Sequence, residues 1–440
     1  MAQFFKPQKK QISNKSQRFT VDSMNHEGLG VTRHQGKVMF IEGALTGEQV
    51  EAKPLTVKSK FAKYSTLKVI EKNVGRVNAF CAHYGQCGGC QLQHATLDLQ
   101  LLEKQNAVSK LFEKFAKVSS LEWQLPLVSP AMHYRRSGRI AVIYDKNKAE
   151  FLVGFRKKRS KQIINIDACQ VMVAPFLPVF ESVRNLLPKM KNGRAISHLQ
   201  VCSVDSGDYL IVRHTKKLCD QDRELLKSLC DTHNWLLVLE HDTGCFSESE
   251  LPYYQFLSLD LKFSFNFDNF IQVNPSVNLA MVQQALDWLA LEQEDSVLDL
   301  FCGIGNFTLP MAKHAGYVVG VEGVNSAIAM AKKNASLNQL DNTDFYCQDL
   351  SQNIQSEDWF NRQYSVLLLD PSRMGAYEIL SQLKLKQFNR ILYVACDPVT
   401  MARDSEIIIK AGFKISKIGL MNMFPHTSHI ETMALFEKEK

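Results

Sequence analysis

A cysteine and a glutamate near the C-terminal end of the chain have neighbours that suggest catalysis. Cys396 lies in ILYVACDP, directly after an apolar run typical of a buried strand, and Arg373 follows another such run in SVLLLDPSRMG. A thiolate is a strong nucleophile, and a nearby cation lowers the pKa of a thiol. We therefore expect Cys396 at a partly exposed strand end, with its pKa lowered by Arg373. The alternative interpretation is a small buried cysteine that only packs.

Methylation of carbon 5 of uracil requires a nucleophile of this kind. Addition of a thiolate to carbon 6 produces an enolate, and the enolate attacks an electrophilic methyl group. The methylated adduct must then lose the proton on carbon 5 to a general base before the cysteine leaves. Glu431, in HTSHIETMALFE directly before the last predicted strand, is the expected proton acceptor. A solvated glutamate is the alternative, and we interpret His426 and His429 as structural or RNA-contacting.

An acidic residue follows each of several predicted strands, which indicates a cofactor site. VLDLFCGIGNFTL has Gly303 and Gly305 in the turn that follows a strand, and glycines there allow the backbone to approach a ligand closely. Glu322 ends the next strand and is placed to bind ribose hydroxyls, and Asp349 is placed to meet an adenine amino group. No lysine for binding phosphate follows the turn, so S-adenosylmethionine fits better than a nucleoside triphosphate. Helix caps and solvated loop acids are the alternative.

Three cysteines are clustered in CAHYGQCGGC, with the spacing C-x5-C-x2-C. A centre with four ligands needs one more thiolate, and Cys169 in IDACQV is the best candidate. Four thiolates suit an iron–sulfur cluster or a structural zinc ion, and the spacing favours a 4Fe–4S cluster. The expected ligands are Cys81, Cys87, Cys90 and Cys169, and we interpret the other cysteines as structural, namely Cys202, Cys219, Cys230, Cys245, Cys302 and Cys347.

Basic and aromatic residues alternate between the two parts of this cysteine group. HYRRSGR contains Arg135, Arg136 and Arg139, and FRKKRSK adds five more basic residues after Phe155. This mixture is typical of surfaces that contact phosphates and stack on bases. A charged strand face is the alternative interpretation.

The pattern of apolar runs predicts three folded parts after a disordered basic arm over residues 1–11. Short alternating stretches with glycine turns over residues 12–70 predict a small β-barrel. Mixed strands and helices over residues 71–265 predict an α+β central domain with an amphipathic helix near 98–117. Residues 266–440 alternate between β and α segments, which predicts a doubly wound, Rossmann-like α/β domain with its ligand at the carboxyl ends of the strands.

The charge of the 440-residue chain is concentrated at its start. Residues 1–72 contain 13 Lys and Arg against 6 Asp and Glu, which accounts for the whole net charge of +7. A basic segment attracts phosphate backbones, so we expect an RNA partner. The start MAQFFKPQKK lacks the apolar run of a secretory signal, and no stretch approaches the roughly 18 apolar residues of a membrane span. We therefore expect a cytoplasmic monomer with no membrane and no obligate protein partner.

Together these motifs resemble the RNA uracil-5 methyltransferase family, and within it the iron–sulfur enzymes that act on 23S ribosomal RNA. The resemblance covers nearly the whole chain. The segments that carry it are CAHYGQCGGC with DAC at 167–169, FIQVNPSVN, DLFCGIGNF, LLDPSRMG, VACDP and HIET.

The resemblance implies a role for each matching residue. The N-terminal barrel is expected to be a TRAM domain, which binds RNA. Cys396 matches the nucleophile and Glu431 the base, and the four cysteines match the 4Fe–4S ligands. The helix near 98–117 is expected to pack on the catalytic domain. Ser372 departs from the usual Pro or Ala, and because it is small we expect the loop to survive. The positions that match S-adenosylmethionine-binding residues are Gln272, Phe301, Asn306, Glu322, Asp349 and Asp370.

Three alternative functions remain open at this point. The methylated uridine could belong to another ribosomal or transfer RNA. A non-catalytic iron–sulfur protein that binds RNA would need neither Cys396 nor Glu431. A cytosine-5 methyltransferase would need groups that hydrogen-bond N3 and the amino group of the ring, and its cysteine motif differs from VACDP.

Overall fold

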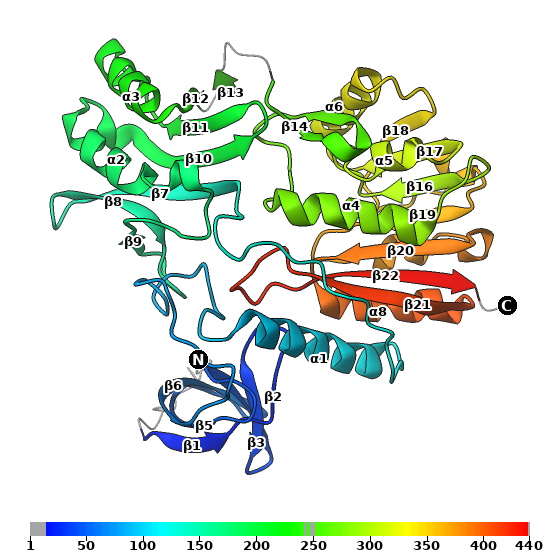
Figure 1. Cartoon of the computed structure of the whole chain (residues 1–440), viewed down its shortest axis with the longest axis horizontal. Helices are drawn as coiled ribbons and strands as arrows, with labels where there is room; N and C mark the ends of the chain where they lie inside the picture. The colour runs from blue at the N-terminus through cyan, green and yellow to red at the C-terminus, as the bar shows by residue number, and fades with distance from the viewer. Residues whose placement is uncertain (1–14, 242–243, 247–250, 439–440) are drawn as a thin grey trace, which may run out of the picture. The chain divides into compact units, whose positions relative to one another are not determined.

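The structure, a computed structural model, describes residues 15–241, 244–246 and 251–438 (Figure 1). The basic arm predicted over residues 1–11 lies outside the described residues. None of the described helices is long and apolar enough to cross a membrane. The chain divides into two compact units: the first comprises Met1–Phe80, Cys90–Ala107 and His426–Ser428, and the second Cys81–Gly89, Val108–Pro425 and His429–Lys440.

The first unit contains one six-stranded sheet with the order β1-β5-β6-β4-β3-β2. The short strands joined by glycine turns that the sequence predicts are present. Gln35 and Gly36 both have positive φ and form the two-residue loop between β3 and β4, where a tight hairpin turn requires such backbone angles. The core contains Phe19, Ile41 and Val50. The strands are β1 (Gln17–Thr20), β2 (Ser23–Met24), β3 (Gly30–His34), β4 (Lys37–Glu42), β5 (Gln49–Val57) and β6 (Phe61–Glu71).

The helix predicted near residues 98–117 is α1 (Leu97–Phe115). In the second unit, Trp123 donates a hydrogen bond to Ser109 Oγ of α1 over 3.1 Å. Trp123 also pairs with Ile418 of β21 (Phe413–Met421). The C-terminal part of α1 is therefore attached, through Trp123, to β21 near the end of the chain.

The second unit begins with a seven-stranded sheet of order β13-β12-β11-β10-β7-β8-β9. One face carries alternating apolar residues such as Ile140, Leu199 and Leu210, and the two helices α2 and α3 complete that core. A separate hairpin of β14 and β15 follows. The elements are β7 (Ser137–Asp145), β8 (Glu150–Arg156), β9 (Ile163–Asn165), α2 (Val179–Leu186), β10 (Ile196–Val204), β11 (Gly207–His214), α3 (Asp220–His233), β12 (Leu236–His241), β13 (Gly244–Phe246), β14 (Tyr253–Phe256) and β15 (Leu261–Ser264).

The C-terminal part of this unit is a second seven-stranded sheet with the order β18-β17-β16-β19-β20-β22-β21 (Figure 1). The five neighbouring strands β18, β17, β16, β19 and β20 are parallel, and β22 is antiparallel to both β20 and β21. This confirms the predicted doubly wound α/β arrangement. The elements not yet given are α4 (Pro275–Leu289), β16 (Ser296–Leu300), α5 (Thr308–Ala312), β17 (Tyr317–Glu322), α6 (Asn325–Leu337), β18 (Thr343–Cys347), β19 (Val366–Leu369), α7 (Tyr377–Leu380), β20 (Arg390–Ala395), α8 (Pro398–Lys410) and β22 (Glu431–Lys438).

The strand order determines where a ligand can bind. The strand β16 is central, and the chain proceeds from it first to β17 on one side and later to β19 on the other. Ligands of open parallel sheets bind outside the carboxyl ends of the strands, at the point where the order reverses. The loops after β16, β17, β19 and β20 therefore converge on one place.

Candidate active site and cofactor cavity

One cavity of about 670 Å³ lies at the carboxyl edge of the catalytic sheet. Its volume is within the usual range for small-molecule sites. All eight residues predicted for cofactor binding and catalysis line it, although they come from separate segments of the sequence: Gln272, Phe301, Asn306, Glu322, Asp349, Asp370, Cys396 and Glu431.

The turn after β16 has backbone angles that favour glycine. Gly303 and Gly305 have φ of 57° and 94°, and a side chain at Gly305 would overlap Leu309 of α5. Phe301 also has positive φ, at 68°. The turn directs the Gly303 N–H to Oε2 of Glu322, over 3.3 Å. The backbone itself thus forms one wall of the cavity.

Two carboxylates at strand ends are held in fixed orientations. Glu322 ends β17, and its Oε1 accepts a hydrogen bond from the Val324 N–H over 3.0 Å. Asp349 follows β18, and its Oδ1 accepts hydrogen bonds from the N–H and hydroxyl of Ser351 at 2.9 and 2.7 Å. These hydrogen bonds lower the pKa of Asp349, so it is ionised at neutral pH.

Two other carboxyl groups, on the neighbouring strands β16 and β19, behave in the opposite way. Burial raises the pKa of Asp370, which follows β19, to about 7, and the charge of Glu322 adds to the shift. Burial likewise raises the pKa of Asp299 in β16 to about 8, although Thr308 donates a hydrogen bond to it over 2.5 Å. Asp370 lines the cavity together with Glu322, Asp349 and Glu431, so its wall is rich in carboxyl groups, and a bound cation would favour their ionised forms.

The two amide residues of the predicted cofactor site are held by neighbouring side chains. Asn306 exchanges a pair of hydrogen bonds with Asn278 of α4, at 2.9 and 3.0 Å, and accepts a third from the Tyr254 hydroxyl at 3.0 Å. The main-chain oxygen of Gln272 accepts a hydrogen bond from Nε of the buried Arg136 over 2.7 Å. Tyr254 and Asn278 cannot be assigned these contacts from the sequence, because partners so distant along the chain leave no local pattern.

Cys396 lies at the junction of β20 and α8. Asp397 is the N-cap of α8, and its side chain accepts hydrogen bonds from the N–H groups of Val399 and Thr400 at 2.9 and 3.4 Å. Pro398 occupies the first helical turn, where its missing N–H costs nothing. The segment VACDP thus ends a strand, exposes one cysteine to the cavity and starts a helix.

The prediction that the pKa of Cys396 is lowered is wrong, because the net shift is upward. Burial raises the pKa of this thiol to about 12, and the charges of Glu431 and Asp370 add to the shift. Arg373 acts in the expected direction but is outweighed. Cys396 is therefore a protonated thiol in this structure.

The loop after β19 is fixed to α8 by a buried carboxylate. Asp404 accepts hydrogen bonds from the Ala376 N–H at 2.7 Å and the Tyr393 hydroxyl at 2.8 Å. Gly375 has φ of 79°, and a Cβ there would lie 2.5 Å from Asp404 Oδ2. The loop places Arg373 on the cavity wall, with its Nη2 3.3 Å from Nδ1 of His429. Ser372 lines the cavity too, and the loop is intact as expected for a small residue.

Three of the four predicted cluster ligands belong to the second unit and are close enough to affect one another. The pKa of Cys169 is raised by burial first and then by Cys87 and Cys81, although the N–H groups of Val171 and Met172 hydrogen-bond to it. The Gly89 N–H donates to Cys87 Sγ over 3.4 Å. Amide hydrogen bonds to sulfur are typical of iron–sulfur sites, so this donor set fits such a cluster. Cys90 belongs to the first unit.

No group of three or more Cys, His, Asp or Glu side chains has metal-binding geometry within the described ranges. The assignment of the four cysteines to a cluster thus remains a prediction.

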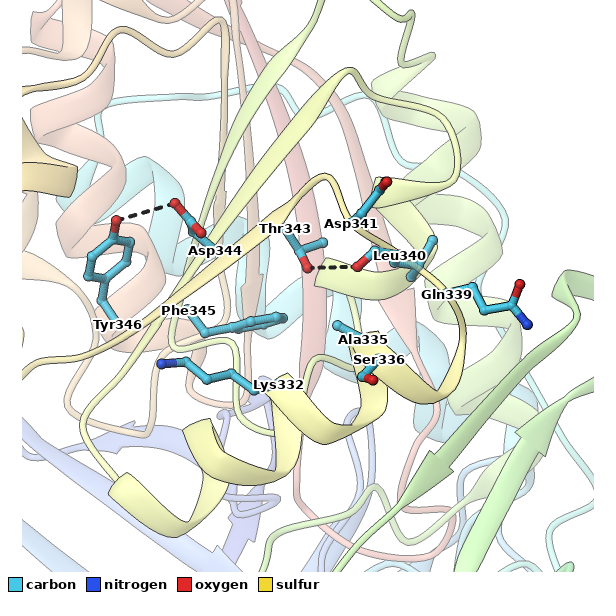
Figure 2. Close-up of a pocket in the computed structure, with 10 residues that line it drawn as sticks. All are labelled: Lys332, Ala335, Ser336, Gln339, Leu340, Asp341, Thr343, Asp344, Phe345 and Tyr346. Carbon is cyan, nitrogen blue, oxygen red and sulfur yellow. Dashed lines mark hydrogen bonds between the residues drawn. The ribbon is translucent and has the colours of Figure 1, made fainter.

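A second large cavity, of about 750 Å³, lies between α6 and the edge strand β18 (Figure 2). Its polar groups bond to one another: Tyr346 donates to Asp344, and Thr343 donates to the Leu340 carbonyl. Asp344 also accepts a hydrogen bond from Arg362 over 3.0 Å. None of the eight predicted site residues lines this cavity, so it is separate from the site at the strand ends.

A doubly wound sheet whose strand-end loops hold ordered carboxylates, a cysteine and a glutamate around one cavity defines a methyltransferase that uses S-adenosylmethionine. Comparison with known proteins identifies the family. The sequence model described as tRNA (Uracil-5-)-methyltransferase matches residues 252–439. Together with relatives that are 50% and 40% identical over the full chain, this match shows that the chain belongs to the RNA uracil-5 methyltransferase family.

Similar proteins cover the whole chain. The 23S rRNA (uracil(1939)-C(5))-methyltransferase RlmD of Pseudoalteromonas translucida is 50% identical over 440 residues, which is 100% of both chains. RlmD of Vibrio campbellii is 40% identical over 441 residues, again 100% of both. The solved structure of the Pyrococcus abyssi tRNA (uracil-54, C5)-methyltransferase with S-adenosyl-L-homocysteine covers 95% of this chain and 99% of its own, with a TM-score of 0.72 and 19% identity. This last likeness concerns the fold.

Proposed function

We propose that the protein methylates carbon 5 of one uridine in 23S ribosomal RNA, at position 1939, the position in the names of its relatives. The observation that carries the proposal is the convergence of all eight predicted residues on one cavity. The cosubstrate supplies an electrophilic methyl group on a sulfonium ion. Glu322 binds the ribose hydroxyls and Asp349 the adenine amino group. Gln272, Phe301, Asn306 and Asp370 complete this binding site.

Cys396 and Glu431 perform the chemistry on the uracil ring. Cys396 first passes its thiol proton to water, and the resulting thiolate bonds to carbon 6 while the electrons of the ring double bond move to carbon 5. Carbon 5 takes the methyl group, and the bond from that methyl to the sulfonium breaks. Glu431 then takes the proton from carbon 5, and Cys396 leaves as a thiolate while the ring double bond forms again.

The raised pKa of Cys396 has a consequence for this order of events. A protonated thiol adds slowly to a pyrimidine, so the free enzyme is protected from side reactions. The positive charge that the cosubstrate brings opposes the charges of Glu431 and Asp370, and Arg373 acts in the same direction. The charge of the cosubstrate is therefore expected to lower the pKa of Cys396 once the site is filled, in addition to the effect that Arg373 already has in the free enzyme.

The N-terminal sheet and the cysteine group support an RNA substrate for the proposed enzyme. Residues 12–70 form the TRAM domain that binds RNA, residues 71–265 a central domain, and residues 266–440 the methyltransferase domain. Cys81, Cys87, Cys90 and Cys169 hold a 4Fe–4S cluster. A ribosomal RNA substrate implies a cytoplasmic enzyme, and we propose that it acts as a monomer, because one chain supplies all eight predicted residues of the cavity.

The test uses 23S rRNA from cells that lack this modification, together with methyl-labelled S-adenosylmethionine. Digestion and mass spectrometry are expected to find one 5-methyluridine per RNA, at position 1939, and none with Cys396→Ala. A methyl group on another uridine would show that the proposed position is wrong, and 5-methylcytidine would show that the proposed base is wrong. Retention of RNA without any methylation would favour a non-catalytic RNA-binding protein.

The cluster has its own test, because iron and sulfide can be measured without any activity. Protein purified without oxygen is expected to contain about four of each per chain. Cys169→Ser is expected to lose both, whereas Cys347→Ser, a change at an exposed cysteine, retains them. One zinc ion per chain, with no sulfide, would show that the site is a structural zinc site.

A further inference from the structure

A smaller cavity of about 210 Å³ lies beside the cofactor cavity. Phe270 and Ile271 line both cavities, so they form a shared wall. The Phe270 side chain is 75% exposed, which is unusual for a large aromatic residue. An exposed aromatic ring between two cavities is a natural surface on which a flat base can stack.

Residues of β7 and β10 build the other wall of the smaller cavity. These two strands are neighbours in their sheet (Figure 1). Arg139 pairs with Gln200 in this ladder, and Ser137 pairs with Cys202. Ile140 and Leu199, which alternate with these positions, belong to the core on the other face. Because side chains alternate along a strand, the four cavity-lining residues project from the opposite face.

The cavity is lined by groups that recognise nucleotides. Arg135 and Arg139 provide two guanidinium groups, and Phe265 and Phe267 provide aromatic surface. Nε2 of Gln200 donates to the Phe267 carbonyl over 3.3 Å, which fixes the orientation of its amide. Among the described residues that line the cavity, none is a carboxylate. Aromatic rings, guanidinium groups and amides suit a base with its phosphate.

We propose that this smaller cavity binds the nucleotide next to the target uridine in the RNA, and this inference rests on the proposed function. The volume is that of about seven water molecules at ~30 Å³ each, enough for one flat heterocycle. A target base must leave its stack to reach Cys396, and this costs free energy. Binding of the neighbouring base against Phe270 offsets that cost and fixes which uridine enters the larger cavity.

The test combines a filled cavity with RNAs that lack one base. Ser137→Phe places a large ring in the cavity from a strand position, where aromatic residues are favoured. Ile143→Phe is the control, because Ile143 is an exposed residue of the same strand that does not line the cavity. Short RNAs carry the target uridine and an abasic site at one flanking position at a time, and kcat/KM is measured for each.

With wild-type enzyme and Ile143→Phe, one abasic position is expected to lower kcat/KM about tenfold to hundredfold, the loss of one stacked base. Ser137→Phe is expected to show the same loss with intact RNA, and no further loss with that abasic RNA. If the losses in kcat/KM caused by Ser137→Phe and by the abasic site instead multiply, the two changes act independently, and the proposal is overturned. A raised KM for S-adenosylmethionine in Ser137→Phe would overturn it too, because the cavity would then belong to the cofactor site.

Arg139→Gln provides a second measurement that removes a charge and does not fill the cavity. It is expected to raise the KM for RNA and to reduce the salt dependence of RNA binding, with cosubstrate affinity unchanged. An unchanged KM for RNA would contradict the proposed nucleotide site. Failure of the proposed function is a distinct result, because wild-type enzyme would then leave the intact RNA unmethylated.

Discussion

Cys396 and Glu431 occupy facing positions at the point where β20 and β22 reach the cavity. The antiparallel ladder pairs Ala395 with Thr432, and the next position along it brings Cys396 opposite Glu431. Glu431 also raises the pKa of the Cys396 thiol. The antiparallel direction of β22 is what allows a residue at the start of one strand to meet a residue just after the end of another.

This pairing predicts the behaviour of Glu431→Gln. The amide cannot take the proton from carbon 5, so the methylated adduct is expected to accumulate with Cys396 still bound to the RNA. Turnover is expected to fall about a hundredfold to ten-thousandfold, the usual contribution of a general base. A denaturing gel detects the adduct as a slow band that contains both protein and RNA.

The matched control for this trap is Glu378→Gln, a change at another glutamate of the same cavity. It is expected to give no slow band and little loss of turnover. Release of methylated RNA by Glu431→Gln at the normal rate would show that another group is the base.

The raised pKa of Cys396 predicts slow alkylation of the free enzyme. Only the thiolate reacts, and a pKa of about 12 leaves little thiolate at neutral pH, so labelling by iodoacetamide is expected to increase steadily as the pH rises from neutral toward about 10. Mass spectrometry of the peptides separates Cys396 from the exposed Cys347, which is expected to react first.

Removal of the neighbouring negative charge should speed this alkylation. Glu431→Gln is expected to raise the labelling rate of Cys396 about tenfold, which corresponds to a pKa lower by about one unit. Glu378→Gln is expected to leave the rate unchanged. Equal rates for Cys396 and Cys347 in the wild-type enzyme would contradict the raised pKa.

Half of the eight predicted cavity residues could be found from the sequence for a physical reason, and the other half came from the resemblance to a family. Parallel strands are buried on both faces and read as continuous apolar runs, so the residue after each run is identifiable, and the topology brings these residues together. Glu322, Asp349 and Cys396 were found in this way. The sign of the Cys396 shift could not be found, because it depends on burial and on how many carboxyl groups surround the sulfur.

Other features depend on contacts between distant segments. The Asn306–Asn278 pair joins a turn to α4, and the smaller cavity needs β7 and β10 to be neighbours. The exposure of Phe270 is likewise a property of the folded chain, since nothing in the segment FIQVNP indicates that this ring is exposed. Patterns along the chain report local structure, and these features have no local signature.

The raised pKa of Asp370 predicts a pH dependence of cosubstrate binding. Asp370 is neutral below about pH 7 and charged above it. The sulfonium cation of S-adenosylmethionine favours the charged form, so its affinity is expected to increase, about tenfold, as the pH rises through this value. S-adenosylhomocysteine has no sulfonium charge and is expected to show a much smaller change in calorimetric titrations.

Two substitutions separate this effect from a general loss of binding. Asp370→Asn is expected to remove the pH dependence. Asp349→Asn is expected to weaken binding by the same factor at every pH tested, because the lowered pKa of Asp349 keeps it charged throughout. An Asp370→Asn enzyme with the wild-type pH dependence would assign the titration to another group, such as Asp299.

Gly375→Ala tests whether the loop that carries Arg373 must keep its position for catalysis. The new Cβ would lie 2.5 Å from Asp404 Oδ2 and 2.7 Å from Arg403 Nη2, at a φ of 79° that disfavours any side chain. The strain is expected to lower the free energy of unfolding by about 1–3 kcal/mol. Because the loop must move away from α8, kcat is expected to fall as well.

Gly412→Ala is the control: its φ is 97°, but no atom lies within 4 Å of the new Cβ, so it should lose stability and keep kcat. Urea unfolding and single-turnover rates measure the two effects separately, and an unchanged kcat in Gly375→Ala would show that the exact position of this loop does not limit methyl transfer.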